Sequence, residues 1–352
     1  ENNLYELAYM FGYKPNVTQV ATTTVDFYQQ VPSILSGSTY VPDFDYSLFI
    51  PANSTVTSTL DTSIPFIVED PIDFSVSSSS DPTDITVYSI NNISSDPEIF
   101  LLKKSRNAIS STIATETFSF NSPTQFTTID ITANNIIGVL DIIDTDGNTW
   151  YEVDYLGQEM VFDSIKNTNV NDPNLSQYKG DTPYLLQLKK IQRRFATRVT
   201  APNNLQIQFG AGTANDNDEE IIPNPDNVGL GLPFEKTKLN TAYSPSNFLF
   251  TKTYGVAPSQ TTLTVRYLTG GGVESNINAN LLTQLTATPT FLKYNLNSVT
   301  ANTFLNSLVV TNPIAADGGG DGDTIEEIRQ NSSANFASQQ RNVTQNDYLV
   351  RA

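Results

Sequence analysis

The segment 136–156 constrains the fold more than any other part of the chain, because its pattern is that of a β-hairpin. An apolar run covers residues 136–143, and an Asp-Gly pair follows at 146–147. Asp-Gly is a preferred pair for a tight turn between two antiparallel strands. Beyond the turn, alternate residues share one face: Tyr151, Val153 and Tyr155. The sequence therefore predicts a hairpin here.

Alternation of apolar and polar residues recurs through most of the chain and predicts further strands. The alternating positions are Val25 and Phe27; Ile85, Val87 and Ser89; Leu205, Ile207 and Phe209; and Leu263, Val265 and Tyr267. A short amphipathic helix is predicted at the start, where Gly12 can end it. Its apolar face is formed by residues at spacings of three and four: Leu4, Leu7, Ala8 and Phe11.

These patterns predict an α+β, β-rich, multidomain chain, with several small antiparallel β-sheet domains and a few short helices at the two ends. A chain of 352 residues can bury more than one core. Composition shifts mark a polar linker at 76–84, a polar loop at 167–183 and a long acidic loop at 212–233. The predicted domains are 1–80, 81–180 with the hairpin, 181–270 with the acidic loop, and 271–352.

The chain contains no cysteine and no histidine, which narrows its possible chemistry. Disulfides, thiolate nucleophiles and thiolate metal sites are excluded. A Ser-His-Asp triad and imidazole metal ligands are excluded as well. We therefore expect no enzyme activity, no catalytic or cofactor-binding residue, and no metal or other cofactor, although carboxylates alone can hydrolyse glycosides.

The balance of charge argues against two classes of partner. With 19 basic and 37 acidic residues, the formal net charge is −18. Such a surface repels nucleic-acid phosphates and anionic lipids, so we expect neither nucleic acid nor membrane as a partner. The opening residues ENNLYELAYM lack the features of a signal peptide and begin without Met. We expect the chain to be part of a longer protein.

The stretch DGGGDGDTIEE, residues 317–327, could bind a metal ion or begin a helix. An EF-hand loop needs oxygen ligands at fixed positions and a bidentate glutamate at position 12. The matching residues are Asp317, Asp321, Gly322 and Asp323. Gly319 stands at the third position and Ile328 at the last, so the bidentate ligand is missing. A glycine-rich calcium repeat is nearly matched too, but that motif works by stacking many copies.

A helix start explains this stretch better than a metal site. With Thr324 as the N-cap residue, Glu327 stands three positions later and completes a capping box. Acidic residues in the first turn also suit the helix dipole. Ile325 and Ile328 then face inward, with Phe336 further along, and the preceding glycines allow a tight entry with positive φ.

A second helix start follows closely. Thr344 is a suitable N-cap with Asp347 at the third helical position, and Val343 and Tyr348 can form a hydrophobic staple. The chain ends at Ala352, within this predicted helix.

Charged clusters give weaker indications. Basic residues gather once, at Lys189, Lys190, Arg193, Arg194 and Arg198. In an acidic protein we favour docking to an acidic partner or to the chain's own acidic run 216–220 over nucleic-acid binding. The acidic pairs Asp141/Asp144 and Asp218/Glu219 are expected in turns or polar loops, where solvated carboxylates are common, so we do not assign them as catalytic.

The end of the chain resembles the C-terminal part of the Baseplate J-like family. That family has a glycine-rich acidic turn, a helix of the Glu-Glu-Ile-Arg type, a Phe, and then an R-x-V-T-x-x-D-Y motif. These features stand at Gly318 to Gly320, Glu326 to Arg329, Phe336, and Arg341 to Tyr348. The early segments LYELAYMFGYKP, ATTTVDF and FIPANSTVTS also resemble that family, which marks 1–80 and 271–352 as its two parts.

The middle of the chain is similar to the large baseplate wedge proteins of T-even-like contractile-tailed phages. The similar segments include GNTWYEVDYLGQEMVFD, EEIIPNPDNVGLGLP and YLTGGGVESN. The resemblance implies a structural role in the virion tail baseplate, assembled in the host cytoplasm. It also implies dimers within a wedge, a ring between wedges, and contacts with other wedge proteins, among which the sheath initiator is a candidate. The family has no catalytic residues to carry over.

Two other functions remain open from the residues alone. A glycan-binding adhesin of a virion surface or a secreted protein would share the Asn- and Thr-rich β character, and would use exposed aromatic platforms or a calcium site near 317–323. A carboxylate-only glycoside hydrolase would need two acids facing each other across a cleft.

Overall fold

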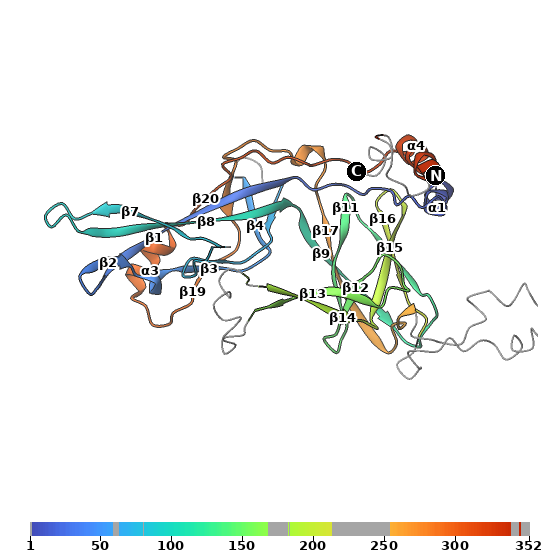
Figure 1. Cartoon of the computed structure of the whole chain (residues 1–352), viewed down its shortest axis with the longest axis horizontal. Coiled ribbons are helices and arrows are strands. Elements are labelled where there is room, and N and C mark those ends of the chain that lie inside the picture. The colour runs from blue at the N-terminus through green and yellow to red at the C-terminus, as the bar shows by residue number, and fades with distance from the viewer. Residues whose placement is uncertain are drawn as a thin grey trace, which may run out of the picture.

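The computed structural model of the protein describes residues 2–58, 63–79, 81–167, 182, 184–212, 254–338 and 345. It is elongated, with one large sheet towards each end (Figure 1). The predicted β-rich α+β class, with separate antiparallel sheets and a few short helices, is confirmed. Within the described residues the α-helices are α1 (Asn2–Met10), α3 (Ser298–Leu305) and α4 (Ile325–Ser338).

The first large sheet has eight antiparallel strands and gathers segments from distant parts of the chain. Its main path runs β18-β4-β5-β8-β1-β2, while β20 pairs with β1 and β7 pairs with β8. The strands are β1 (Thr22–Ser36), β2 (Thr39–Pro42), β4 (Ser54–Ser58), β5 (Phe66–Val68), β7 (Asp84–Ile90), β8 (Pro97–Ser110), β18 (Leu282–Leu285) and β20 (Val309–Thr311).

Alternation along β1 and β8 builds the first core. Val25 and Phe27 are fully buried on one face of β1, as predicted. Phe100 and Leu102 of β8 belong to the same core. Because successive side chains of a strand point to opposite faces, both long strands bury mainly alternate residues; Asp26 of β1 is also buried, on the other face.

The second large sheet has seven strands in the order β10-β16-β15-β12-β11-β17-β9. All its pairs are antiparallel except β12 with β15. The predicted alternation is confirmed in β16 and β17, whose apolar positions are buried. The strands are β9 (Thr112–Phe120), β10 (Thr128–Thr132), β11 (Ile136–Ile143), β12 (Thr149–Glu152), β15 (Arg194–Ala201), β16 (Asn204–Phe209) and β17 (Thr261–Thr269).

The predicted hairpin at 136–156 is confirmed as the pair β11 and β12. Its turn contains Gly147 at φ +79°, a conformation that glycine adopts without strain. The second strand is shorter than expected, because it ends at Glu152 when the chain leaves the sheet. Tyr155 therefore lies beyond the strand and is exposed, whereas Trp150 enters the core.

The two terminal helices pack beside the second sheet, and Tyr5, Ala8 and Ile328 belong to its core. Helix α1 ends at Met10, and Gly12 terminates it as predicted, with a backbone φ of +77°. The amides of Gly12 and Tyr13 donate to the carbonyls of Tyr9 and Ala8, at 3.0 and 2.8 Å, which forms a Schellman motif.

The inward face assigned to α1 was partly wrong. Leu7 and Phe11 are exposed, because α1 turns the side of Tyr5 and Ala8 to the sheet. Phe336 of α4 was expected to face inward, but 63% of it is exposed. Its ring lies against Phe11, with 5.2 Å between the ring centroids, at the outer edge where α1 and α4 meet.

Two small sheets complete the described fold. One is the two-stranded pair β13 (Met160–Lys166) and β14 (Tyr184–Lys190). The other joins β3 (Leu48–Ile50) to β6 (Ile72–Asp73) and β19 (Thr290–Phe291). Short 3-10 helices are η1 (Phe44–Tyr46) and η6 (Val273–Ser275).

The two large sheets do not follow the boundaries of the four predicted domains. The first sheet takes strands from 1–80, 81–180 and 271–352, and the second takes strands from 81–180 and 181–270. The expected linker 76–84 is held by side-chain hydrogen bonds and is no free linker. Apart from residue 345, the predicted second helix at 343–348 lies outside the described residues, as do nearly all of the loops 167–183 and 212–233.

Candidate functional site: the acidic turn and the exposed hairpins

The glycine- and aspartate-rich turn runs beside the start of β1. Thr22 and Asp317 exchange backbone hydrogen bonds of 2.8 and 3.1 Å, and the amide of Gln19 donates to the carbonyl of Gly320 at 2.8 Å. Gly318 has φ +85°, as the predicted positive-φ entry requires. A Cβ atom at Gly319 would lie 2.6 Å from the backbone oxygen of Gly272, so only glycine fits there.

The carboxylate of Asp323 is already occupied by protein donors. It accepts hydrogen bonds from the Tyr13 hydroxyl at 2.5 Å and from the Asn16 amide at 2.8 Å. Burial, together with the hydrogen bond to Asp323, raises the pKa of Tyr13 to about 12. Among the described residues, no group of three or more acidic side chains is placed to hold a metal ion. The turn fastens the chain before α4 to the segment after α1.

The predicted capping box at the start of α4 is confirmed. The Thr324 amide donates to the Glu327 carboxylate at 2.8 Å, and the Glu327 amide donates to the Thr324 hydroxyl at 3.4 Å. The helix begins at Ile325, and Ile328 is fully buried. Hydrogen bonds from the backbone and side chain of Thr324 lower the pKa of Glu327. These residues therefore position the start of a helix.

The two acids of the pair Asp141/Asp144 have separate structural partners. Asp141 lies within strand β11, not in a turn as expected, and its carboxylate pairs with the guanidinium of Arg266 on β17. Asp144 accepts from the amides of Asp146 and Asn148 at 3.0 and 2.8 Å in the hairpin turn. Burial opposes ionisation of Asp144, but these hydrogen bonds prevail and lower its pKa. Asp218 and Glu219 lie outside the described residues.

The predicted basic cluster forms only in part, because Lys189, Lys190 and Arg193 line one pocket but Arg194 does not. Arg194 is buried, and its guanidinium donates to the carbonyls of Leu156 and Ile191 at 2.7 and 2.6 Å. It therefore joins two loops from inside the fold. The acidic run 216–220, its expected partner, lies outside the described residues.

The other basic residues of this cluster each contact a different group. Lys189 donates to the Tyr151 hydroxyl at 2.6 Å. The remaining contacts are Lys189 with Asp163 at 3.3 Å, Lys190 with Glu159 at 3.7 Å, Arg193 with Asp144 at 3.5 Å, and Arg198 over the ring of Tyr9. Because the described acids already pair with most of these cations, the cluster offers no continuous basic stripe.

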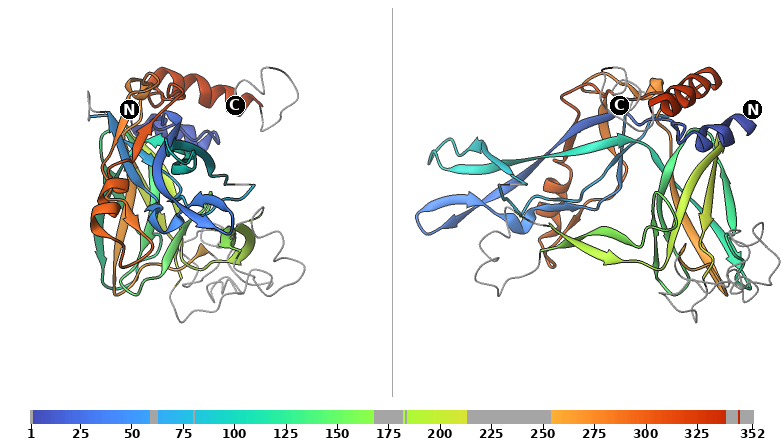
Figure 2. Two further views of the ribbon diagram at one scale, coloured as in Figure 1. Left: turned by 90° about the vertical axis from the view of Figure 1, so that its left-hand side faces the viewer. Right: turned by 45° about the vertical axis from the view of Figure 1, so that its right-hand side comes forward.

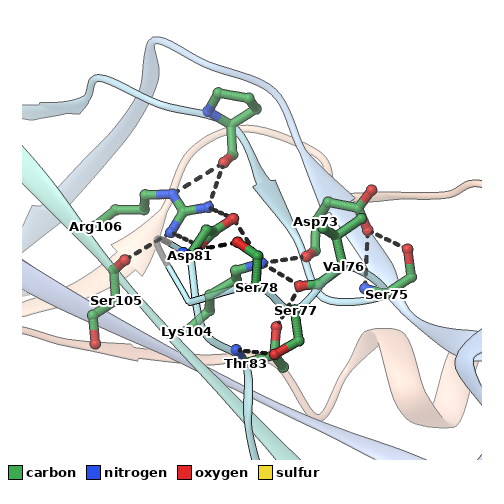
Figure 3. Close-up of polar contacts among 11 residues, drawn as sticks. Asp73, Ser75, Val76, Ser77, Ser78, Asp81, Thr83, Lys104, Ser105 and Arg106 are labelled. Atoms are coloured by element: carbon green, nitrogen blue, oxygen red, sulfur yellow. Dashed lines mark hydrogen bonds and ion pairs between the residues drawn. The ribbon is translucent and has the colours of Figure 1, made fainter. Parts of the chain in front are cut away.

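Sequence reasoning missed a buried polar cluster beneath β8 (Figure 3). The Lys104 ammonium is fully buried and donates to the carbonyls of Asp73 and Val76 at 2.8 and 2.6 Å. It also pairs with Asp81 at 2.9 Å, so all three of its donors are used. Arg106 completes the cluster through a bidentate contact with Asp81 at 2.7 and 3.0 Å.

The pKa values agree with a structural role for this cluster. Burial lowers the pKa of Lys104, and its pairing with Asp81 offsets this only in part. Burial opposes ionisation of Asp81, but hydrogen bonds from Arg106 and Lys104 outweigh it and lower the pKa of Asp81. A signal existed in the sequence, because Lys104 has the same strand parity as Phe100 and Leu102 and must point inward.

The β13–β14 hairpin leaves an apolar face uncovered. Residues directly opposite in the ladder share a face, as Phe162 does with Leu188. Phe162 is 74% exposed and Leu186 is 75% exposed. The exposed apolar side chains of this face, called here the hairpin face, are Met160, Phe162, Tyr184, Leu186 and Leu188. Ser164 and Lys190 lie on the same face.

Two comparisons with known proteins identified no relative of this chain. A scan against models of protein families and a search of curated proteins both found no match. No helix among the described residues is long and apolar enough to cross a membrane.

Proposed function

We propose that this chain is a structural component of a phage tail baseplate wedge, similar to the gene-six product type of T-even-like phages. In this role it builds the inner baseplate ring and transmits conformational change when the sheath contracts. The resemblance of the terminal and middle segments to Baseplate J-like proteins supports the proposal. The structural observation that carries it is the exposed hairpin face of β13 and β14.

An isolated two-stranded hairpin is at best marginally stable in water, so the hairpin face favours a covered state. Fully burying one Leu or Phe side chain contributes roughly 1.5–3 kcal/mol. The five apolar side chains of the hairpin face are about half to three-quarters exposed. Covering them would contribute on the order of 5–10 kcal/mol, before the cost of association is subtracted. A subunit contact of this size suits an assembly protein.

The polar clusters support a structural role over a catalytic one. The acids and bases singled out from the sequence are engaged in turns, caps and cross-strand pairs, as described for Asp144, Asp323 and Arg194. Each therefore stabilises the fold locally. We accordingly propose contacts with a second copy, with neighbouring wedges and with other wedge proteins, at the virion tail baseplate.

The test is assembly of the full-length protein with its neighbouring tail proteins, imaged by electron microscopy. Wedge-shaped particles or rings are expected with the natural chain. Leu186→Lys should abolish or reduce them, because it places a charge in the centre of the hairpin face. Gln187→Lys adds the same charge on the opposite face of the same strand, so it should leave assembly intact. Particles that form equally well with Leu186→Lys, or the absence of particles with the natural chain, would contradict the proposal.

A further inference from the structure

Strand β7 lies on an open edge of the first sheet. Within the described chain it pairs only with β8, in the arm that projects at the end of the molecule away from α1 and α4 (Figures 1 and 2). Its sequence, DITVYSI, contains neither the proline nor the lysine that commonly block edge strands. Bulges interrupt its ladder near Ser89, but the outer backbone groups of the strand still have no partner strand among the described residues.

The side chains of β7 are unusually apolar for an exposed edge. Ile85 and Val87 lie opposite Leu102 and Phe100, which are buried in the first core. Ile85 and Val87 therefore lie on the face of the sheet that carries the core, but no other element of the described chain covers that face at β7. Val87 is accordingly 50% exposed. Further exposed apolar residues of this arm are Tyr88, Ile90 and Ile93. A strand added to this edge would gain main-chain hydrogen bonds and contacts with these side chains.

The charge of the arm indicates what kind of strand would bind. Residues 84–99 carry Asp84, Asp96 and Glu98 and no basic residue. These acids have no ion-pair partner within the part of the chain that the structure describes. The lysine opposite Asp84, Lys103, pairs with Asp26 at 2.9 Å. A partner with basic side chains would therefore be complementary to this arm.

We infer that β7 binds an extended, basic and apolar segment of another protein, which adds a strand to the edge of the first sheet. A second copy docking through the same arm would bring like charges together, and the chain has a net charge of −18. The inference rests on the proposed role as an assembly scaffold, because it specifies the chemistry of one partner contact.

A synthetic peptide tests the inference without the rest of the assembly. The probe has about ten residues in which lysine alternates with valine or isoleucine, matching the length of a strand. A sister peptide has glutamate in place of each lysine. The lysine peptide should bind the full chain at least about tenfold more tightly than the glutamate peptide, and should slow amide exchange in 84–90. Equal affinity, no binding at about 1 mM, or protection elsewhere would overturn the inference.

Substitutions in the full chain test whether the lysine peptide binds at β7. Val87→Lys should weaken binding of the lysine peptide at least about tenfold, because it adds a positive charge beside the edge. Val273→Lys is the matched control, since Val273 is 59% exposed in η6, outside this arm. Glu98→Gln leaves the edge intact and should weaken both the binding and its salt dependence. If both the Val87→Lys and the Glu98→Gln variants bind the lysine peptide as tightly as the natural chain does, β7 is not the binding site.

A crosslinking experiment separates this inference from the proposed function. A photo-reactive phenylalanine at position 88 is introduced into the full-length protein, which is then mixed with its neighbouring tail proteins. A crosslink to a basic segment of another protein supports the inference. Assemblies that form without a crosslink, or with one to an acidic segment or a second copy, overturn it. If no assembly forms, the proposed function fails, whereas the peptide experiment still decides whether β7 binds a basic strand.

Discussion

Replacing Lys104 by methionine tests whether the buried polar cluster holds the segment 71–83 onto β8. Methionine keeps most of the length of the side chain and removes all three donors. The carbonyls of Asp73 and Val76 then lose charge-assisted hydrogen bonds of 2.8 and 2.6 Å, and Asp81 loses an ion pair of 2.9 Å. Lys104→Met should therefore lower the free energy of unfolding and loosen this segment.

The size of the decrease in unfolding free energy depends on which hydrogen bonds Asp73, Val76 and Asp81 keep in the variant. Each carbonyl keeps one other donor, the Thr83 hydroxyl at 2.7 Å for Val76 and the Val76 amide at 3.4 Å for Asp73. The loss is therefore that of two hydrogen bonds to a charged group, at about 1.5–3 kcal/mol each. The Asp81 side chain is 31% exposed and keeps its bidentate contact with Arg106, so its lost pair adds little. Methionine also removes the cost of burying an ammonium group, which offsets part of the loss. The expected net decrease is about 2–4 kcal/mol.

Urea unfolding followed by circular dichroism measures this change, with amide exchange reporting on segment 71–83. Lys293→Met is the control, since Lys293 forms an exposed ion pair with Asp45 and its loss should change the free energy of unfolding much less than Lys104→Met does. Equal effects of Lys104→Met and Lys293→Met, or unchanged exchange in segment 71–83, would refute the view that Lys104 fastens this segment.

Two further predictions concern the junction between α1, β1 and α4. Because the pKa of Tyr13 is raised in the folded state to about 12, its contribution to stability is complete below pH of about 10 and is lost as the pH rises through about 12. Tyr13→Phe should remove this part of the alkaline loss, seen as a smaller fall in the melting temperature, and an unchanged alkaline profile would contradict it. Gly319→Ala should lower the melting temperature, because the added Cβ would lie 2.6 Å from the backbone oxygen of Gly272. Gly320→Ala is the control, since its Cβ would meet only the flexible side chain of Gln19 at 3.4 Å. Equal melting temperatures of the two variants would argue against the close contact at Gly319.

Local elements were predictable because their signals lie within a few residues of each other. The alternation at Leu205, Ile207 and Phe209 requires only that one face of a strand be buried. The capping box of Thr324 and Glu327 likewise involves a single helical turn. Each pattern carries its own physical cause, so the structure reproduces it.

Long-range pairing was not predictable from such patterns. β1 pairs with β20 across almost the whole chain, with Phe27 opposite Val310, and nothing local to either residue specifies this partner. The same limit explains Asp141, whose partner Arg266 on β17 is brought close only by the sheet. The exposure of Phe336 also depends on where α1 and α4 meet, not on the periodicity of α4 alone.

The connection between the two large sheets bears on the proposed mechanical role. Segments 17–21, 270–276 and 317–323 pass between the two cores and touch through their backbones. The Gln19 carbonyl accepts from the Gly272 amide at 3.0 Å, and the Gln19 amide donates to Gly320 at 2.8 Å. Three segments joined by backbone hydrogen bonds resist bending more than a single linker does, and the close backbone approaches at Gly271 and Gly319 restrict sliding. A body joined in this way would move as a unit, which a scaffold needs if it is to pass a displacement from one neighbour to the next.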